Sequence, residues 1–154
     1  MKTRVRVIAC MASLAILMTV PSALAQAGKL VGVWKITEAE TFGNNPQKIK
    51  DPRPGILIFT RNHFSWVDVH GNPAPELPEN PTLANFAAAF EQLTAFSGSY
   101  EVKGSSITAN IIVSKDPGAT SEGSTLYFEY KFEGDTLVLT LRQFNLELKM
   151  SRLE

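Results

Sequence analysis

Cysteine is almost absent from this chain, which has one, Cys10, among 154 residues. An internal disulfide is therefore excluded, and a folded domain has to rest on its hydrophobic core. The sequence also lacks an excess of charge of one sign, because 15 basic residues balance 15 acidic ones without forming a basic stripe. Nucleic acid is consequently a poor partner, since its binding depends on clustered Lys and Arg.

Histidine is scarce as well, with His63 and His70 as the only two. They lie seven residues apart on one expected strand and have opposite parity. They should therefore face different sides of the sheet and cannot share a metal ion. The segment 115–123 carries too few carboxylates to favour a Ca²⁺ site. We expect neither a metal nor a cofactor.

Long hydrophobic runs are missing except near the N-terminus. There, three basic residues precede an apolar run at 7–20, and a small-x-small site ends at Ala25. This order is typical of a signal peptide cleaved after residue 25, and the run is shorter than the roughly 20 residues of a membrane span. We therefore predict a periplasmic or secreted protein without a stable membrane anchor after cleavage. Its single domain, residues 26–154, would contain no cysteine and carry a formal charge of −3 from 12 basic and 15 acidic residues.

Strand-like segments with alternating long and short connections make up the rest of the chain. If the strands run up and down in order, every tight turn lies at one end of the sheet and every long connection at the other. This arrangement predicts an all-β, eight-stranded up-and-down antiparallel barrel, a fold that can hold one small ligand. The long connections are 42–54, 71–96 and 115–123, and the tight turns are 61–62, 103–106 and 134–135.

Alternation of apolar and polar residues places the eight strands. The two-residue turn at 61–62 sets Phe59 opposite Phe64 and Leu57 opposite Trp66, and these large side chains are expected to face inward. The expected strands are 29–41, 55–60, 63–70, 98–102, 107–114 and 124–132, then one through Leu137, Leu139 and Leu141 and one through Leu146, Leu148, Met150 and Arg152.

One helix is expected within the longest connection, over residues 81–96. Asn80 can cap it, Pro81 suits its first turn, and apolar residues recur along it at intervals of three and four. Because the connection begins and ends at the open end of the barrel, we expect this helix to lie over that end as a lid. Its apolar stripe consists of Leu83, Phe86, Phe90 and Leu93.

The segment Gly32-Val33-Trp34, preceded by Leu30-Val31, resembles the Gly-x-Trp opening of lipocalins and related calycin barrels. The resemblance implies that Gly32 lets the chain bend at the closed end of the barrel. It also implies that Trp34 plugs the floor and is covered by an arginine from the last strand, here Arg152. A guanidinium group over an indole face is a favourable pair.

More closely, the chain is similar to the bacterial single-domain lipocalin-like family. The similarity rests on the order and spacing of the segments 30–34, 55–60, 96–102 and 132–137. It implies a barrel with a cavity. The chain departs from typical lipocalins because it has neither their disulfide nor a long helix after the last strand. It also carries a helix between the third and fourth strands, where typical lipocalins have only a turn.

The inward positions in the upper halves of the strands define a candidate site. Glu38, Asp68 and His70 would lie near the open end, and Tyr100 midway along its strand. An apolar lining with a few convergent polar groups is typical of a small-molecule site. The apolar wall would consist of Trp66, Ile111, Leu126, Phe128 and Leu141, with Phe86 and Phe90 above it.

Three functions fit this site. The first, which we favour, is binding of a small, largely apolar molecule whose polar end is oriented by Tyr100, His70 and a carboxylate. The second is a cofactor-free isomerase or cyclase that uses Asp68 or Glu38 with His70 to move protons. The third is a barrel filled by its own side chains, which would act through its surface in a cell-envelope assembly.

Overall fold

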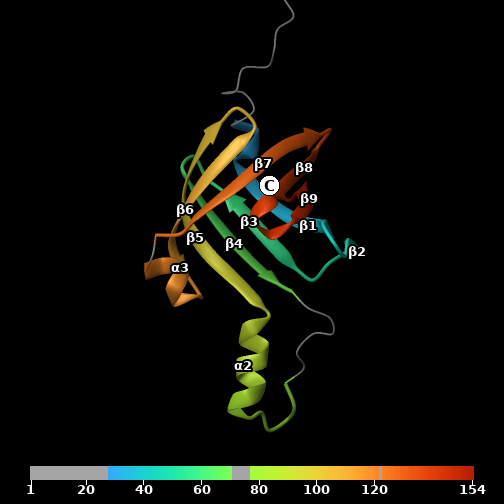
Figure 1. The fold of residues 1–154 in the computed structure, drawn as a ribbon, viewed down its shortest axis with the longest axis vertical. Coiled ribbons are helices and arrows are strands. Elements are labelled where there is room, and N and C mark those ends of the chain that lie inside the picture. Colours follow the sequence, from blue (N-terminus) through green and yellow to red (C-terminus); the bar gives the residue numbers. More distant parts are fainter. Residues whose placement is uncertain (1–27, 71–76, 122) are drawn as a thin grey trace, which may run out of the picture.

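The computed structural model describes residues 28–70, 77–121 and 123–154 (Figure 1). The expected signal peptide, residues 1–25, lies outside the described residues. Within them, nine strands form one antiparallel sheet. The chain is therefore mostly β, as its alternating pattern predicts.

Eight of these strands close into a barrel, since each pairs with its neighbour in an antiparallel manner and β1 also pairs with β9 (Figure 1). The expected eight-stranded up-and-down barrel is confirmed. Its strands are β1 (Gly32–Thr41), β3 (Gly55–Phe59), β4 (His63–Val69), β5 (Leu93–Lys103), β6 (Ser106–Ser114), β7 (Thr125–Glu133), β8 (Thr136–Leu141) and β9 (Leu146–Arg152).

The one strand of this sheet that is not part of the barrel is β2 (Gln47–Lys50), which extends the sheet beside it. It pairs with the second half of β1, whereas the first half of β1 pairs with β3. The connection 42–54 thus contains a short exposed strand, where the sequence indicated only a loop.

The closed end is built around Trp34, which is 1% exposed. Its indole Nε1 donates a 2.8 Å hydrogen bond to the Leu30 carbonyl, and the Arg152 guanidinium lies 4.3 Å from the centre of its ring. Gly32 has a φ of +148°, and a Cβ atom there would overlap the Arg152 guanidinium. Glycine is therefore required where the first strand begins.

Arg152 also ties the end of β9 to the segment before β1. Its Nη1 donates a 2.8 Å hydrogen bond to the Val31 carbonyl, and its Nη2 donates one to the Lys29 carbonyl. The Arg152 guanidinium thus covers the Trp34 ring and also donates hydrogen bonds to backbone carbonyls that no neighbouring strand pairs. It can do both because it carries several donors in a fixed plane.

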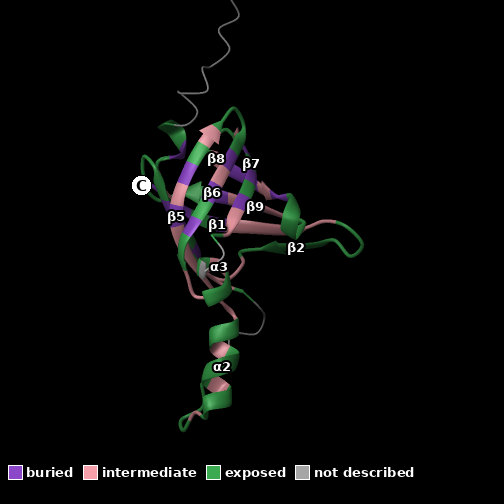
Figure 2. Ribbon diagram, turned by 60° about the vertical axis from the view of Figure 1, so that its left-hand side comes forward, coloured by how far each residue is buried: buried purple, intermediate pink, exposed green. Residues whose placement is uncertain are grey.

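Inward-facing side chains fill the barrel above this floor. Buried and exposed residues alternate along several of the strands (Figure 2). The Phe59 and Tyr100 rings lie 5.1 Å apart, centre to centre, near the closed end. Farther up, the Trp66 ring lies 5.4 Å from that of Phe96 and 6.2 Å from that of Phe128. Aromatic rings from opposite sides of the barrel therefore meet at its centre.

The pairing of β3 with β4 places the residues that matter at the open end. Phe59 is opposite Phe64 and Leu57 is opposite Trp66, in the register that the turn at 61–62 predicts. The next inward pair toward the open end is Gly55 and Asp68.

Two β-bulges change which side chains face inward. In β1 the register shifts between Ile36 and Glu38, so Ala39 takes the inward position and Glu38 faces outward. In β6 the register shifts opposite Ser97 and Gly98, and Val113 faces outward beside Ser97. The expectation of an inward Glu38 is therefore wrong, because an extra residue in a strand reverses the alternation beyond it.

The helix α2 (Leu83–Glu91) is shorter than expected and begins later. Its N-cap is Thr82 rather than Asn80, and Thr82 and Asn85 exchange hydrogen bonds in a capping box. After it, β5 begins at residue 93, five residues before the expected start, because pairing with β4 continues to the pair Val69 and Leu93. Long-range strand pairing thus overrides the local helical pattern of residues 93–96.

Helix α2 does not cover the barrel but projects away from its open end (Figures 1 and 2). None of its residues is buried, and Phe86 and Phe90 are 50% and 52% exposed. The expected lid is therefore not formed by this helix. A different short helix, α3 (Pro117–Ser121), packs Ala119 against the core in a segment that the sequence indicated only as a long connection.

Candidate functional site

Among the buried polar side-chain atoms that lie outside strict hydrogen-bond geometry, two belong to neighbouring inward residues at the open end of the barrel. They are the indole Nε1 of Trp66 and the carboxylate Oδ1 of Asp68, both on inward positions of β4. Trp66 is only 4% exposed, whereas Asp68 is partly exposed toward the open end. Buried polar groups in folded proteins are nearly always paired, and these two side chains act on one another.

The chain makes room for Asp68 by placing glycine opposite it. A Cβ atom on Gly55 would lie 2.8 Å from the Cβ of Asp68 and 2.6 Å from the Cδ1 of Ile36. On the other side, Asp68 pairs with Thr94 of β5. The Asp68 carboxylate therefore lies between Gly55, which has no side chain, and Thr94, which carries a hydroxyl group.

Burial raises the pKa of Asp68 above its ordinary value. The Thr94 hydroxyl, the Trp66 indole and the positive charge of a protonated His70 act in the opposite direction and are weaker. The indole N–H and the Thr94 hydroxyl thus act on the carboxylate as hydrogen-bond donors, and the Trp66 and Asp68 side chains are within reach of one another.

Thr94 links Asp68 to His70. The Thr94 Oγ1 lies 3.3 Å from the Nδ1 of His70, and the His70 backbone N–H donates a 2.8 Å hydrogen bond to the Gln92 carbonyl. The side-chain Oε1 of Gln92 is a further buried acceptor without a partner. Asp68, Thr94, His70 and Gln92 thus form the polar part of the open end.

The structure brings part of the expected site together. Trp66 and Asp68 are adjacent inward residues of β4, and His70 follows them at the strand end. The expected apolar wall lies inside the barrel as well and is buried in the core: Ile111, Leu126, Phe128 and Leu141.

Glu38 is not part of this site. It faces outward beyond the bulge in β1 and forms ion pairs with Lys48 at 3.2 Å and Lys149 at 3.7 Å. The hydrogen bond from Lys48 lowers the pKa of Glu38, so this carboxylate is an ordinary paired surface group.

Tyr100 lies at the closed end rather than beside the polar groups. Its hydroxyl donates a 2.7 Å hydrogen bond to the Thr60 carbonyl next to the tight turn, and its backbone N–H donates to the Asn62 carbonyl. Burial raises the pKa of this hydroxyl. Tyr100 therefore fastens the turn to the floor, and the expectation that it lies in the ligand site is not supported by its position.

Phe86 and Phe90 lie outside the barrel. With Ala87 and Ala89 they line a groove of about 620 Å³ that is completed by the strand-end residues Val69 and Leu93. The Lys115 ammonium lies 4.8 Å from the centre of the Phe90 ring and donates a hydrogen bond to the Phe90 carbonyl. The helix is thus held at its base while its apolar stripe faces solvent.

Thr94 and Phe96 are site residues that the sequence reasoning missed. Both fall in residues 93–96, which the apolar stripe assigned to the helix. The signal that could have found them is the alternation of Thr94, Phe96, Gly98 and Tyr100, which has the period of two that is typical of a strand. These four residues face inward along β5.

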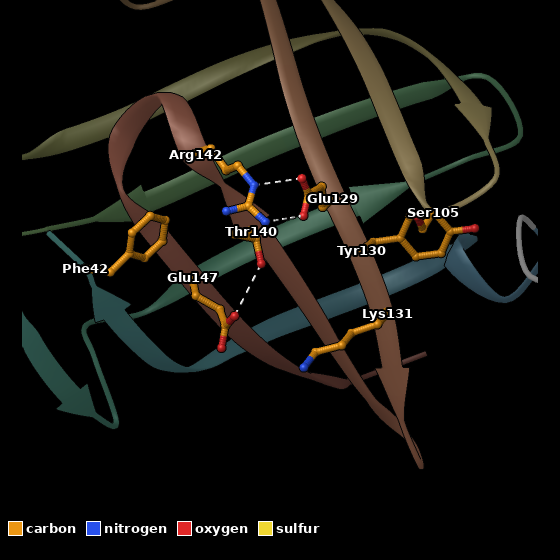
Figure 3. A pocket seen from close by; sticks show the side chains of 8 residues that line it. All are labelled: Phe42, Ser105, Glu129, Tyr130, Lys131, Thr140, Arg142 and Glu147. Atoms are coloured by element: carbon orange, nitrogen blue, oxygen red, sulfur yellow. Dashed lines mark hydrogen bonds and ion pairs between the residues drawn. The ribbon is translucent and has the colours of Figure 1, made fainter.

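A second pocket, of about 490 Å³, lies on the outer face of the barrel (Figure 3). Its charged groups are already paired: Arg142 forms two hydrogen bonds with the Glu129 carboxylate, at 2.8 and 2.9 Å, and Thr140 donates to Glu147. The ion pair with Arg142 lowers the pKa of Glu129. Because its groups satisfy one another, this pocket resembles an ordinary solvated face more than a binding site.

Neither a metal site nor a spanning helix is found in the part of the chain that the structure describes. No group of three or more His, Cys, Asp or Glu residues there could hold a metal ion. No helix there is long and apolar enough to cross a membrane.

Two features define the type of barrel. The strands follow one another around a closed meander, and Trp34 lies at the floor under Arg152 of the last strand. The fold is that of a lipocalin-like barrel.

Two solved structures are similar to this lipocalin-like barrel. A lipocalin-like protein from Bacteroides uniformis ATCC 8492 is 17% identical, with a TM-score of 0.49, over 82% of this chain and 100% of that chain. An uncharacterized protein from Bacteroides eggerthii DSM 20697 is 11% identical, with a TM-score of 0.47, over 80% of this chain and 98% of that chain. No protein-family model matches the sequence, and no curated protein matches it significantly.

Proposed function

We propose that this lipocalin-like barrel binds a small, largely apolar molecule at its open end. The observation that carries the proposal is the group of polar side chains Asp68, Thr94 and His70 at the open end of the barrel, beside the aromatic rings of Trp66 and Phe96. An apolar surface with a few convergent polar groups is also the usual composition of a small-molecule site.

The packing of the barrel defines where such a molecule would sit. Below Trp66 the interior is filled, because its ring meets those of Phe96 and Phe128. The molecule would therefore lie above the Trp66 ring, with its apolar body against the upper strands. Ala119 of α3 packs against the core at the same end and would limit how far the molecule extends.

The test is native mass spectrometry of the protein purified from its source, followed by titration of the stripped protein with apolar probes. We expect a copurified organic molecule and a change in tryptophan fluorescence on titration. Trp66→Phe should remove most of that fluorescence change, whereas Trp34 at the floor remains as an internal reference. A protein that is folded, carries no adduct and responds to no probe would favour the packed barrel that acts through its surface.

A second candidate function is proton transfer on a bound substrate. It is favoured by one observation, the chain of Asp68, Thr94 and His70 in which Thr94 Oγ1 lies 3.3 Å from His70 Nδ1. A carboxyl group whose pKa is raised by burial holds a proton more tightly than an ordinary carboxyl group and can exchange it with a substrate. Replacing His70 with alanine should lower turnover by roughly 10²–10⁴ in an enzyme but change affinity only a few-fold in a binding protein.

Export of the protein is part of the proposal and rests on the sequence of residues 1–25. Expression of the whole chain in a bacterial host with a periplasm, followed by intact-mass measurement, should give a mature protein that begins at Gln26. A protein that keeps residues 1–25 and stays in the cytoplasm would contradict this part alone.

A further inference from the structure

We propose that this protein forms a symmetric dimer in which α2 of each copy packs on the outer face of the other copy's barrel. The inference goes beyond the proposed ligand site and does not depend on it. It rests on two exposed apolar surfaces of one chain: the stripe of α2 and the outer face of β3, β4 and β5.

The outer face of the barrel is uncharged where β3, β4 and β5 lie side by side. We name this surface the outer patch, and it consists of Ile56, Ile58, Ser65, Val67, Ala95 and Ser97. Its two serine hydroxyls satisfy one another, since Ser97 donates a 2.8 Å hydrogen bond to Ser65. The solvent face of an antiparallel sheet is usually polar, so an apolar outer patch indicates a contact surface.

The far side of the same barrel has the usual charged surface. On β7, the outward Glu129 pairs with Arg142, and the outward Lys131 pairs with Glu133. The lack of charge on β3, β4 and β5 is therefore a property of one side of the barrel and not of the whole fold.

The outer patch continues onto α2. Val69 and Leu93 are the next outward residues of β4 and β5 and lie opposite each other where this strand pair ends. With Phe86 and Phe90 of the helix they line the groove of about 620 Å³ described above. Because α2 projects away from the barrel, it does not cover the outer patch of its own chain (Figure 1). A second copy can cover both surfaces at once.

The two surfaces have matching lengths. Helix α2 has nine residues, and at about 1.5 Å per residue it is roughly 13 Å long. From Val69 to Ser65 the apolar surface also extends roughly 13 Å along β4, at about 3.3 Å per residue. An isologous contact uses the same two surfaces twice. A two-fold axis near the ends of β4 and β5 would therefore lay each helix along the outer patch of the other copy.

The exposed apolar area is sufficient for a specific contact. The contributing side chains and their exposed fractions are Leu83 87%, Phe86 50%, Phe90 52%, Ile56 41%, Ile58 38% and Val67 47%. At about 200 Å² for a fully exposed large side chain, these fractions amount to roughly 600 Å² per copy. A dimer would then bury roughly 1,200 Å² in total, at the lower end of the range for specific interfaces, so we expect a micromolar dissociation constant.

The charges favour a second copy over a lipid surface. Helix α2 contains no Lys or Arg, whereas helices that lie on membranes usually carry these residues on their polar face. The one charged residue of α2 is Glu91, and Lys35 borders the outer patch beside Ile56. Because these two charges have opposite signs, the helix of one copy and the outer patch of another are electrostatically complementary.

Sedimentation equilibrium of the purified mature protein over a series of concentrations tests the inference. We expect a monomer–dimer equilibrium. Two variants, Phe86→Asp with Phe90→Asp on the helix and Val67→Asp on the outer patch, should each weaken the dimer at least about a hundredfold, because they bury charge without a partner. Below the dissociation constant all these proteins are monomers, so the contact does not affect their stability there.

Mixing the two variants distinguishes a helix on the outer patch from a contact between two helices. In a mixed dimer, the natural helix of the Val67→Asp chain meets the natural outer patch of the helix variant, so one of the two contacts is intact. We expect the mixture to dimerise more tightly than either variant alone. If Val67→Asp alone leaves the dimer unchanged, the outer patch takes no part and the inference is wrong.

Tyr127→Asp is the matched control, because Tyr127 is 62% exposed on β7, outside both surfaces, and the change should leave the dimer unaffected. Circular dichroism and the urea midpoint check folding, and Ile56→Asp replaces Val67→Asp if the latter does not fold. A natural protein that stays monomeric throughout the series would overturn the inference. Binding of that monomer to phosphatidylglycerol vesicles, lost in the helix variant, would assign the stripe to a lipid surface instead.

Discussion

At the level of single residues, burial of the Asp68 carboxylate lowers the stability of the protein, while the same carboxylate lies where the proposed ligand would bind. Its carboxylate is partly desolvated at the open end and faces a strand position without a side chain. A residue that only stabilised the barrel would be apolar here, as Trp66 and Phe64 are on the same face of β4. The cost is therefore expected to appear in the stability of the protein without ligand.

We predict that Asp68→Asn stabilises the protein relative to the natural one increasingly as the pH rises from the ordinary pKa of 3.8 through the raised pKa of Asp68. Burial raises the pKa of Asp68 above its ordinary value of 3.8, so the folded state holds this proton more tightly than the unfolded chain does. Between the ordinary and the raised pKa, the folded protein then loses stability as the pH increases. Urea unfolding of both proteins over a pH series measures the difference in the free energy of unfolding.

The variant has to be compared with the natural protein at each pH, because other carboxylates make the folded state more stable as the pH rises. The pKa values of Glu38, Glu129 and Glu133 are lowered by hydrogen bonds from Lys48, Arg142 and Lys131, and these groups are the same in both proteins. A difference that shrinks as the pH rises would show that the folded protein stabilises the Asp68 anion.

A second prediction at this level concerns Arg152. Replacing it with alanine removes the contact with the Trp34 ring and leaves the Val31 and Lys29 carbonyls without that donor. We expect the free energy of unfolding to fall by about 1–2 kcal/mol, with only part of it restored by lysine, which lacks the planar set of donors. Arg142→Ala is the matched control, because it removes an exposed ion pair and should have a much smaller effect. Equal effects of the two alanine variants would argue against a special role for the floor.

At the level of secondary structure, α2 differs most from what its sequence suggests. A helix with an apolar stripe normally buries that stripe, yet Phe86 and Phe90 remain half exposed on a helix that projects from the barrel. Its capping box and its alanines stabilise the helix locally, and the contact of Lys115 with Phe90 anchors its base. The helix therefore forms without resting on the core.

We predict that the double variant Phe86→Asp, Phe90→Asp has nearly the same thermal stability as the natural protein. Exposed side chains away from special features usually change stability by no more than about 0.5 kcal/mol each. Phe128→Ala is the matched comparison, because this ring is buried against Trp66 and its loss should cost about 3–5 kcal/mol. Differential scanning calorimetry measures both. A large loss of stability in the double variant would show that α2 packs on the barrel in solution.

At the level of the whole molecule, the pairing of β9 with β1 closes the barrel. Strand β9 pairs along its length with β8 on one side and β1 on the other, and it contributes the buried Leu148 and Met150. Without it, two strand edges and the inner face of β8 would be exposed to water. Closure therefore couples the first strand of the barrel to the last.

We predict that a chain ending at Asn145 loses cooperative unfolding. A control that ends at Arg152 keeps all of β9 and should remain folded, with a modest loss from the hydrogen bonds that Val33 makes with Leu153 and Glu154. Urea titration followed by circular dichroism distinguishes the two chains, because only a cooperative fold gives a sharp transition. A sharp transition in the shorter chain would mean that the remaining strands form an independent unit.

The structure also gives the molecule two unlike ends. At the closed end, tight turns, Trp34 and Arg152 satisfy the backbone and pack tightly. At the open end, the long connections carry α2 and α3, and the polar side chains of Asp68, Thr94 and His70 lie together. This difference places the proposed ligand at one end of the barrel and the structural supports at the other.

The sequence by itself determined the barrel and part of the site. Alternating apolar residues and the alternation of long and short connections are local properties, and they predict eight strands in an up-and-down order. The two-residue turn at 61–62 fixed the inward side of β4, which is why the positions of Trp66 and Asp68 could be predicted. Close to a two-residue turn, the turn itself fixes which residues of the two strands lie opposite each other, and therefore which side chains share a face.

Only the tertiary structure decided the positions that depend on distant strands. The bulge in β1 turns Glu38 outward, the early start of β5 leaves Tyr100 near the closed end, and pairing with β4 draws Thr94 and Phe96 out of the expected helix. The direction of α2 likewise follows from where the strands on either side of it, β4 and β5, end. It does not follow from the amphipathic pattern of the helix. Each of these outcomes is set by a balance between local preference and pairing with residues far away in the chain, and a local pattern contains only the first of the two.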